Sequence, residues 1–383
     1  MTRVDSRRPL LLGLLLANSS SCTKPSSEAY FTPVEVARHE VRPSATAGPG
    51  EAISDHFEDT YQPHVLTLPV VVPPSGELFV FLPGTGAQTT SFDWIAQFAA
   101  FHGTPTLTLA YDNTLSVEAA CNDGVVAGCQ RDDVACDESV RREALYGRST
   151  HDSACIDVPD HDAIVHRTLR AVQWLSTQFP EDGFERFLEE EGAALDWSRI
   201  GVGGWSQGGG HAGLLAGDHE LARAVYLSKG AGAVRCGELT PEQQAQWNCD
   251  PSLATATATQ PEQADALAVP APWANQPRAT PSDRQRGAVH LDEQAILYSL
   301  ETFIAFGMLS SERDALDIDT IDDPSDPEGA LATSRAYVTD ARPSCGPTDF
   351  HPSMATDECL SLLRHGVPAL ADAYTWMFAP HPP

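Results

Sequence analysis

The chain has 383 residues, of which 42% are hydrophobic and 20% are charged. This length and composition suit a soluble globular protein with one large hydrophobic core or two smaller ones. With 24 basic residues against 53 acidic ones the formal net charge is -29, and no basic patch interrupts the acidity, so we expect neither nucleic acid nor an anionic membrane surface as a partner.

Residues 1–22 have the pattern of an export signal. Three arginines charge its start, and the apolar run that follows is too short to span a bilayer. The stretch "SRRPLLL" is also similar to a twin-arginine signal. "NSSSC" then makes Cys22 a candidate for lipid attachment in the bacterial envelope, and ordinary cleavage a few residues earlier, with secretion, is the alternative.

The nine cysteines favour export by the general secretion route, because disulfides do not normally form in the cytosol. Without Cys22, eight remain, at positions 121, 129, 136, 155, 236, 249, 345 and 359, which suits up to four disulfides. Proximity in the sequence suggests Cys236–Cys249 and Cys345–Cys359, with the other four paired among themselves. No pair has CxxC spacing, so a zinc site is not expected.

Residues 23–60 are rich in Ser, Pro, Ala and Glu without a sustained hydrophobic period, and they predict a flexible tether. The rest of the chain, 61–383, predicts one α/β domain. In chain order we expect strand 64–72, strand 78–82, helix 91–103, strand 104–111, helix 162–180, strand 199–205, helix 207–217, strand 222–230, strand 286–291, helix 293–309, strand 334–340 and helix 357–379. This alternation indicates a mostly parallel central sheet with helices on both faces.

Two irregular segments interrupt the alternation and are expected to be insertions that shape the substrate pocket. Residues 113–160 hold four cysteines and predict a disulfide-pinned excursion, whereas 231–285 are rich in Pro, Ala, Thr and Gln. A third segment, 314–328, is densely acidic but lacks the D-x-D-x-D-G spacing of a helix–loop–helix calcium site, so a solvated loop is expected there.

The motif with the clearest chemistry is G-x-S-x-G, matched by Gly204-Trp205-Ser206-Gln207-Gly208. It lies between an expected strand and an expected helix of small residues. A sharp turn there would hold Ser206 in a strained conformation with its oxygen exposed at the end of the sheet. The dipole of the following helix would face a developing negative charge. These features favour Ser206 as a nucleophile over a plain glycine-rich turn.

A second part of the site is expected upstream, where "LFVFLPGTGAQ" is a strand that runs into a glycine loop. A serine turn of this kind takes one oxyanion-hole amide from the residue after the nucleophile and another from a loop after an earlier strand. We therefore expect the amides of Gln207 and of Thr85 or Gly86 to form the oxyanion hole. A plain glycine turn is the alternative.

The serine needs a base, and the base needs an acid. We expect these groups at the ends of later strands, in the order serine, acid, histidine. Asp292 follows strand 286–291, and His351 lies in the loop after strand 334–340. Ser206, His351 and Asp292 are accordingly predicted as nucleophile, general base and orienting acid.

Other residues compete for these roles. Asp340 also ends a strand, but it leaves no room for a helix before His351. His365 lies within the last expected helix and more plausibly packs or faces water. His211, His290 and Trp205 lie close to the expected site and are candidates for lining the substrate pocket, although a core role suits His290 equally well.

Over roughly residues 64–380 the chain resembles the α/β-hydrolase superfamily. More narrowly, it is similar to a group of exported bacterial α/β-hydrolases with a strand followed by "LPGTG", an elbow close to "GHSQGGGHA" and a "W…TP…R…G…H..D" segment. The corresponding stretches here are "FLPGTGAQ", "GGWSQGGGHAG" and "WANQPRATPSDRQRGAVHLDE". The last match also implies Asp292 as the acid. Trp205 replaces that group's usual histidine, and "GWSxGG" is also similar to the elbow of bacterial cutinases and polyester hydrolases.

The sequence therefore predicts a secreted or lipid-anchored serine hydrolase that cleaves carboxylic esters, small or polymeric, through an acyl-enzyme on Ser206, with no metal or organic cofactor. Two alternatives stay open. One is a surface binding protein that kept the fold without activity, and the other is a serine peptidase on the same fold.

Overall fold

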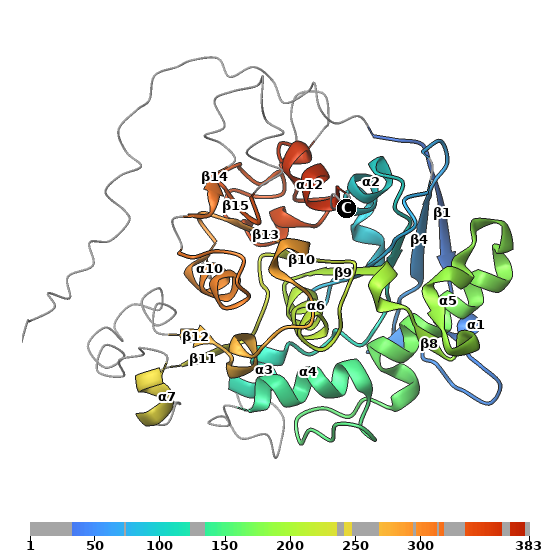
Figure 1. Cartoon of the computed structure of the whole chain (residues 1–383), viewed down its shortest axis with the longest axis horizontal. Coiled ribbons are helices and arrows are strands. Elements are labelled where there is room, and N and C mark those ends of the chain that lie inside the picture. The colour runs from blue at the N-terminus through green and yellow to red at the C-terminus, as the bar shows by residue number, and fades with distance from the viewer. Residues whose placement is uncertain are drawn as a thin grey trace, which may run out of the picture.

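The computed structural model describes residues 33–72, 74–122, 135–235, 241–246, 268–293, 296–311, 314–317, 334–361 and 368–379. Its centre is a nine-stranded sheet (Figure 1). In spatial order the strands are β1 (Val36–Val41), β4 (His64–Pro69), β6 (Thr106–Thr108), β5 (Leu78–Leu82), β9 (Ile200–Trp205), β10 (Arg223–Leu227), β13 (Gln285–His290), β15 (Ala336–Thr339) and β14 (Leu316–Asp317). Strand β4 is antiparallel to both of its neighbours, and every other pair is parallel. The expected mostly parallel sheet is confirmed.

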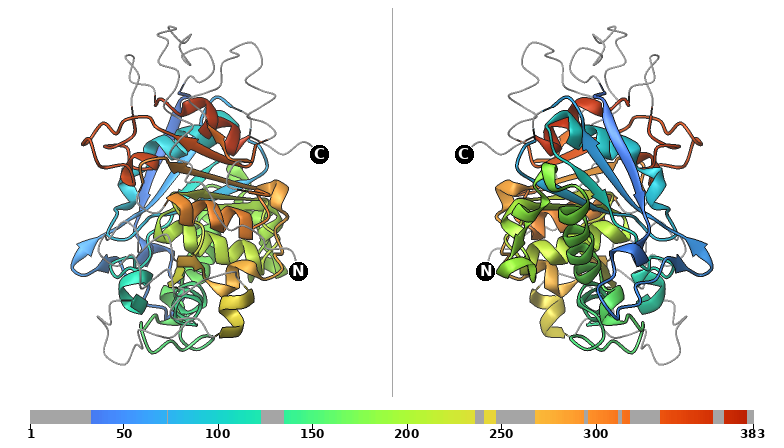
Figure 2. Two further views of the ribbon diagram at one scale, coloured as in Figure 1. Left: turned by 90° about the vertical axis from the view of Figure 1, so that its left-hand side faces the viewer. Right: turned by 90° about the vertical axis from the view of Figure 1, so that its right-hand side faces the viewer.

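Helices cover both faces of the sheet, as Figure 2 shows. Helices α2 (Asp93–Phe101) and α12 (Ala371–Phe378) pack on one face, and α5 (Ile164–Gln178), α6 (Gln207–Asp218) and α10 (Ile296–Ala305) pack on the other. Successive side chains of a strand point to opposite faces. Phe79 and Phe81 therefore join the core under α2 and α12, whereas Val80 joins the core under α5, α6 and α10.

Part of the segment expected to be a tether is instead structured. Strand β1 pairs antiparallel with β4 along its whole length and forms one edge of the sheet. Its sequence, VARHEV, has three consecutive polar residues at 38–40, and only Val41 is buried, so the hydrophobic signal of this edge strand is weak. Helix α1 (Pro43–Thr46) and the hairpin of β2 (His56–Phe57) and β3 (Thr60–Tyr61) follow it.

The insertion at 113–160 contains helices α3 (Val117–Asn122) and α4 (Cys136–Tyr146), joined by a disulfide between Cys121 and Cys136. The expected pair Cys345–Cys359 is confirmed. Cys236 and Cys249 lie outside the described residues, as do the export signal with Cys22 and most of the acidic loop. The two disulfides are compatible with an extracellular protein. None of the described helices is long and apolar enough to cross a membrane.

The expectation of one long helix over 357–379 is wrong. Helix α12 covers only Ala371–Phe378, residues 357–361 are turns, and 362–367, with His365, lie outside the described residues. Pro368 explains the late start, since proline is tolerated near the beginning of a helix but not in its interior. The remaining elements are β7 (Leu188–Glu189), β8 (Ala194–Leu195), β11 (Ala233–Arg235), α7 (Pro241–Gln246) and β12 (Ala268–Pro270), with short 3₁₀ turns between elements.

Candidate active site

Ser206 occupies the junction between β9 and α6, at the carboxyl edge of the sheet. Its backbone has φ 55° and ψ −120°, a conformation that side-chain-bearing residues rarely adopt. The turn is held by the Ser206 amide, which donates to the Leu227 carbonyl on the neighbouring β10 at 2.9 Å. The chain thus maintains a strained serine where a strand turns directly into a helix, as a nucleophile elbow requires.

The two motif glycines are required by close backbone approach. A Cβ atom on Gly204 would collide with the backbone of Gly208, and one on Gly208 would collide with the carbonyl of Leu82 at the end of β5. A Cβ atom on Gly209 or Gly213, two further glycines of α6, would likewise collide with a backbone carbonyl of the loop after β10. The glycine-rich first turns therefore let α6 start immediately behind Ser206 and pack closely against the sheet.

The loop after β5 lies beside the elbow. The Thr85 hydroxyl donates to the Gln207 side-chain oxygen at 2.6 Å, which joins the two segments expected to form the oxyanion hole. Asn113 fixes the loop, since its side-chain nitrogen donates to the carbonyl of Gly84 at 2.6 Å and to that of Ala87 at 2.9 Å. Sequence reasoning missed Asn113, whose contacts are all distant in the chain.

Of the two candidate amides in this loop, that of Gly86 is already engaged. It donates to the Asn113 carbonyl at 2.9 Å. This bond leaves Thr85 as the loop's candidate donor. Gln207 is the first residue of α6, and its N–H has no acceptor within the helix. The amides of Thr85 and Gln207 can therefore face an oxyanion, whereas the placement of Gly86 does not suit that role.

His351 lies beside the elbow and is bound to a carboxylate. Its Nδ1 is 2.5 Å from Oε1 of Glu293, whose side chain is only 4% exposed, while the His351 side chain is 38% exposed. The His351 ring packs on Trp205, the neighbour of Ser206, with ring centres 4.9 Å apart. Among the described residues no hydrogen bond joins the Ser206 hydroxyl to His351, and catalytic contacts of this kind are often loose in free enzymes.

The carboxylate partner of His351 is thus Glu293, and not Asp292 as the sequence analysis expected. After β13 the chain makes a tight turn, in which the Glu293 amide donates to the His290 carbonyl at 3.1 Å and the Asp292 amide donates to Nδ1 of His290 at 3.0 Å. This turn leaves Asp292 exposed and buries Glu293. Asp340, the other candidate acid, is exposed as well. The sequence "HLDE" contains both candidate acids, but strand periodicity does not predict which of two adjacent acids points inward.

Trp205 and His290 support the site from within the core. Trp205 is 7% exposed, and its indole N–H donates to the His351 carbonyl at 2.9 Å. His290 is fully buried, its Nε2 lies 3.0 Å from the Ala341 carbonyl, and its ring stacks on Phe350, the residue before His351. Because Nδ1 accepts a hydrogen bond, Nε2 carries the proton. Both side chains hold the His351 loop and neither offers much surface to a substrate.

A buried ionic chain lies behind the first turn of α6. Arg141 on α4 is 1% exposed, pairs with Asp137 at 3.0 Å, and donates to the Gln207 carbonyl at 3.2 Å. The Trp273 indole donates to the same carboxylate at 2.7 Å. This chain ties the disulfide-bonded insertion to the elbow. The local sequence around Arg141 does not predict these contacts.

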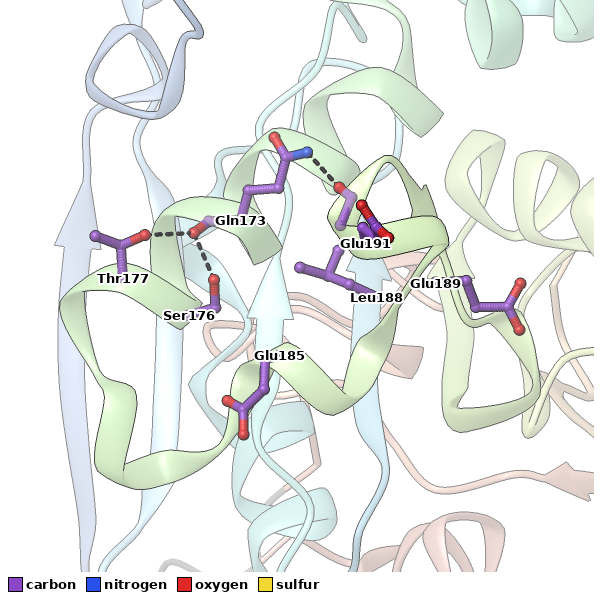
Figure 3. A pocket seen from close by; sticks show the side chains of 8 residues that line it. Gln173, Ser176, Thr177, Glu185, Leu188, Glu189 and Glu191 are labelled. Atoms are coloured by element: carbon purple, nitrogen blue, oxygen red, sulfur yellow. Dashed lines mark hydrogen bonds between the residues drawn. The ribbon is translucent and has the colours of Figure 1, made fainter.

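Of two pockets that described residues line, the smaller one includes Gln207, the residue after Ser206. The larger, about 550 Å³, is lined by the end of α5 and by 185–192, including Gln173, Glu185 and Glu191 (Figure 3). That segment leads through β8 to the amino end of β9, whereas Ser206 follows its carboxyl end. The smaller pocket, about 60 Å³, is lined in part by Gln207 and His211. Of these two pockets, the smaller one is therefore the one next to the elbow.

No protein-family model matches the chain, and no curated protein matches it at a significant level. Its function is therefore inferred from the sequence and the geometry of the site.

Proposed function

We propose that this protein is an exported serine hydrolase of the α/β-hydrolase fold that cleaves carboxylic esters through an acyl-enzyme on Ser206. The observation that carries the proposal is the Ser206 backbone, held at φ 55° between β9 and α6. A serine kept in this strained conformation at the carboxyl edge of a mostly parallel sheet has a functional explanation as a nucleophile.

The pair of Glu293 and His351 supplies the base. Glu293 binds Nδ1 of His351, so the other ring nitrogen, Nε2, is the one free to take the Ser206 proton. The buried carboxylate orients the ring and stabilises the imidazolium that forms, and it does not itself take the proton. In chain order the three groups run serine, acid, histidine, the order of α/β-hydrolases, which supports this fold over an unrelated α/β sheet.

The reaction proceeds in two steps. As Ser206 Oγ attacks the ester carbonyl, His351 takes its proton, and the amides of Thr85 and Gln207 stabilise the oxyanion, each donor contributing about 3 kcal/mol. His351 then protonates the leaving alcohol as the bond from the carbonyl carbon to the alcohol oxygen breaks. A water, deprotonated by His351, attacks the acyl-enzyme, the carboxylic acid leaves, and Ser206 Oγ regains the proton.

The proposal is tested by hydrolysis of p-nitrophenyl butanoate and of the matched p-nitroanilide by the mature, oxidised protein. We expect rapid ester turnover that is lost in Ser206→Ala and in His351→Ala, with the anilide hydrolysed far more slowly. Anilide hydrolysis at a comparable rate would indicate a peptidase instead. Absence of turnover of either substrate by folded protein would favour a binding protein.

A further inference from the structure

The small pocket beside α6 has a mixed lining. About 60 Å³ in volume, it is lined mainly by aliphatic side chains of α3, of α4 and of the loops on either side of these helices, together with a few polar groups. The lining residues are Asp112, Leu115, Val117, Val140, Ala144, Ile156, Asp157, Val158, Gln207 and His211. Gln207, one of these residues, directly follows Ser206 in the chain, which places the pocket next to the elbow.

The position of the pocket in the sheet indicates which part of an ester it would hold. Thr85 follows β5 and Asp112 follows β6, on one side of the central β9. Glu293 follows β13 and His351 follows β15, on the other side. Because His351 must protonate the leaving alcohol, the alcohol departs on its own side. The acyl group is then directed to the opposite side, where the pocket lies.

One lining residue has an unmet hydrogen-bonding capacity. His211 is fully buried, and neither ring nitrogen has a hydrogen-bond partner among the described residues. Burial, and then the charge of Arg141, lower the pKa of His211 well below its usual value, so the ring is neutral with one donor and one acceptor. Its only close ring neighbour in the described part is Tyr111, at 5.6 Å. An orphaned polar ring facing a pocket calls for a ligand or a bound water.

We propose that this pocket binds a short acyl group carrying a polar substituent, such as a hydroxyl, with His211 as its hydrogen-bonding partner. The proposal rests on the proposed function and adds the substrate class. The aliphatic residues enclose the carbon chain and His211 selects the substituent. A buried site built to hydrogen-bond a hydroxyl discriminates strongly against an analogue that lacks it, because its own polar groups are then left unpaired.

The small volume of the pocket, about 60 Å³, favours a short acyl group. A 3-hydroxybutanoyl group suits this size better than an octanoyl group does. We therefore expect a sharp fall in kcat/KM as the acyl chain lengthens beyond about four carbons.

The test compares two nearly isosteric esters, p-nitrophenyl 3-hydroxybutanoate as each enantiomer and p-nitrophenyl 3-methylbutanoate. The wild-type protein should hydrolyse one enantiomer of the hydroxy ester with a kcat/KM about tenfold above that of the methyl ester. His211→Leu should reduce that ratio to near one while the methyl ester is still hydrolysed. His161→Leu, at a side chain that is 38% exposed, is the matched control and should keep the wild-type ratio.

A second pair of variants tests the pocket without touching His211. Val140→Phe fills it and should lower kcat/KM for the butanoate ester at least tenfold relative to the acetate ester. Val71→Phe makes the same change at a residue that is 64% exposed and should leave the two rates in their wild-type ratio. This pair keeps the test decisive if His211→Leu fails to fold.

Labelling of Ser206 by a fluorophosphonate separates failure of this inference from failure of the proposed function. If wild type and variants label equally fast, but the hydroxyl preference is absent or survives His211→Leu, or the chain-length ratio survives Val140→Phe, the pocket assignment is wrong while the hydrolase stands. If folded wild type does not label at all, the proposed function fails and the pocket assignment fails with it.

Discussion

At the scale of single residues, the proposed chemistry depends on backbone strain at one serine and on one buried carboxylate. Ser206 has φ 55° because β10 holds its amide and because α6 must start directly behind it. Strain of this kind typically costs about 1–3 kcal/mol and persists where the surrounding structure enforces it. Glu293 is buried because the turn at His290 directs it inward.

The strain predicts an unusual order of stability. Glycine adopts the Ser206 conformation without a Cβ penalty, so Ser206→Gly should be more stable than Ser206→Ala by about 1 kcal/mol. This is opposite to the order expected within a helix, where glycine destabilises. Urea unfolding of the two inactive variants measures the difference. Equal stability, or a more stable alanine variant, would mean that the turn is not strained.

The carboxylate assignment predicts a contrast between adjacent residues. Glu293→Gln should lower kcat by about 10²–10⁴-fold, because an amide that donates to Nδ1 leaves His351 in the wrong tautomer. Asp292→Asn changes an exposed side chain and should keep kcat within about twofold. Steady-state kinetics of both variants on one ester decides whether Glu293 or Asp292 is the acid. The reverse result would return the acid role to Asp292.

At the scale of elements, a disulfide and an acidic side chain fix the loop that carries His351, in addition to its contacts with Trp205 and His290. The disulfide between Cys345 and Cys359 closes a loop of sequence separation 14 around His351. Asp357 then binds this loop to α2, where its two carboxylate oxygens accept from the amides of Asp93 at 2.7 Å and Trp94 at 2.9 Å. The histidine is thus held by an anchored loop and not by a regular element.

Removal of this disulfide should affect both stability and chemistry. Cys345→Ala/Cys359→Ala should lower the free energy of unfolding by about 3 kcal/mol and should also lower kcat, because His351 loses its anchoring. The control is Cys121→Ala/Cys136→Ala, which removes a disulfide of sequence separation 15 away from His351. This control should lower the free energy of unfolding by a similar amount but leave kcat for an acetate ester near that of the wild type. Equal kcat values for both variants would contradict the anchoring role.

The Asp357 carboxyl predicts a pH dependence with a defined sign. Burial outweighs its hydrogen bonds and raises its pKa from 3.8 to about 6, so the folded protein binds this proton more strongly than the unfolded chain does. Its contribution to stability is therefore full below about pH 4 and is lost as the pH rises to about 6. The side chain of the Asp357→Asn variant cannot ionise.

The variant should accordingly match the wild type at pH 4 and exceed it by about 2 kcal/mol at pH 7. Urea unfolding of both proteins across this pH range gives the difference, and the background of other carboxylates cancels in the comparison. An Asp357→Asn variant that is less stable than the wild type at pH 7 would show that the hydrogen bonds to α2 outweigh the cost of burial.

At the scale of the whole molecule, the elements with a clear local sequence pattern were predictable, whereas features that depend on long-range contacts were not. Strands β4, β5, β6, β9, β10, β13 and β15 and helices α2, α5, α6 and α10 were predictable because each has its own hydrophobic pattern. The Ser206 turn was predictable as well, because its glycines are adjacent in the chain. Edge strand β1 has only a weak period. The engagement of the Gly86 amide depends on Asn113, whose contacts the sequence does not reveal.

The excess of acidic residues predicts how the folded protein responds to salt. A net charge of -29 destabilises the compact state through self-repulsion, which ions screen over about 8 Å at physiological ionic strength. The melting temperature should therefore rise by a few degrees between low and moderate sodium chloride at pH 7. A constant or falling melting temperature would show that attractive surface ion pairs, such as Arg148 with Asp157, dominate instead.

The most direct test of the central claim is fluorophosphonate labelling of the mature, oxidised protein, with the modified residue located by mass spectrometry. The account predicts rapid labelling at Ser206 alone, no labelling of Ser206→Ala, and labelling of Glu293→Gln slowed in proportion to its loss of kcat. A folded wild-type protein that resists the reagent, or that is labelled elsewhere, would contradict the assignment of Ser206 as an activated nucleophile.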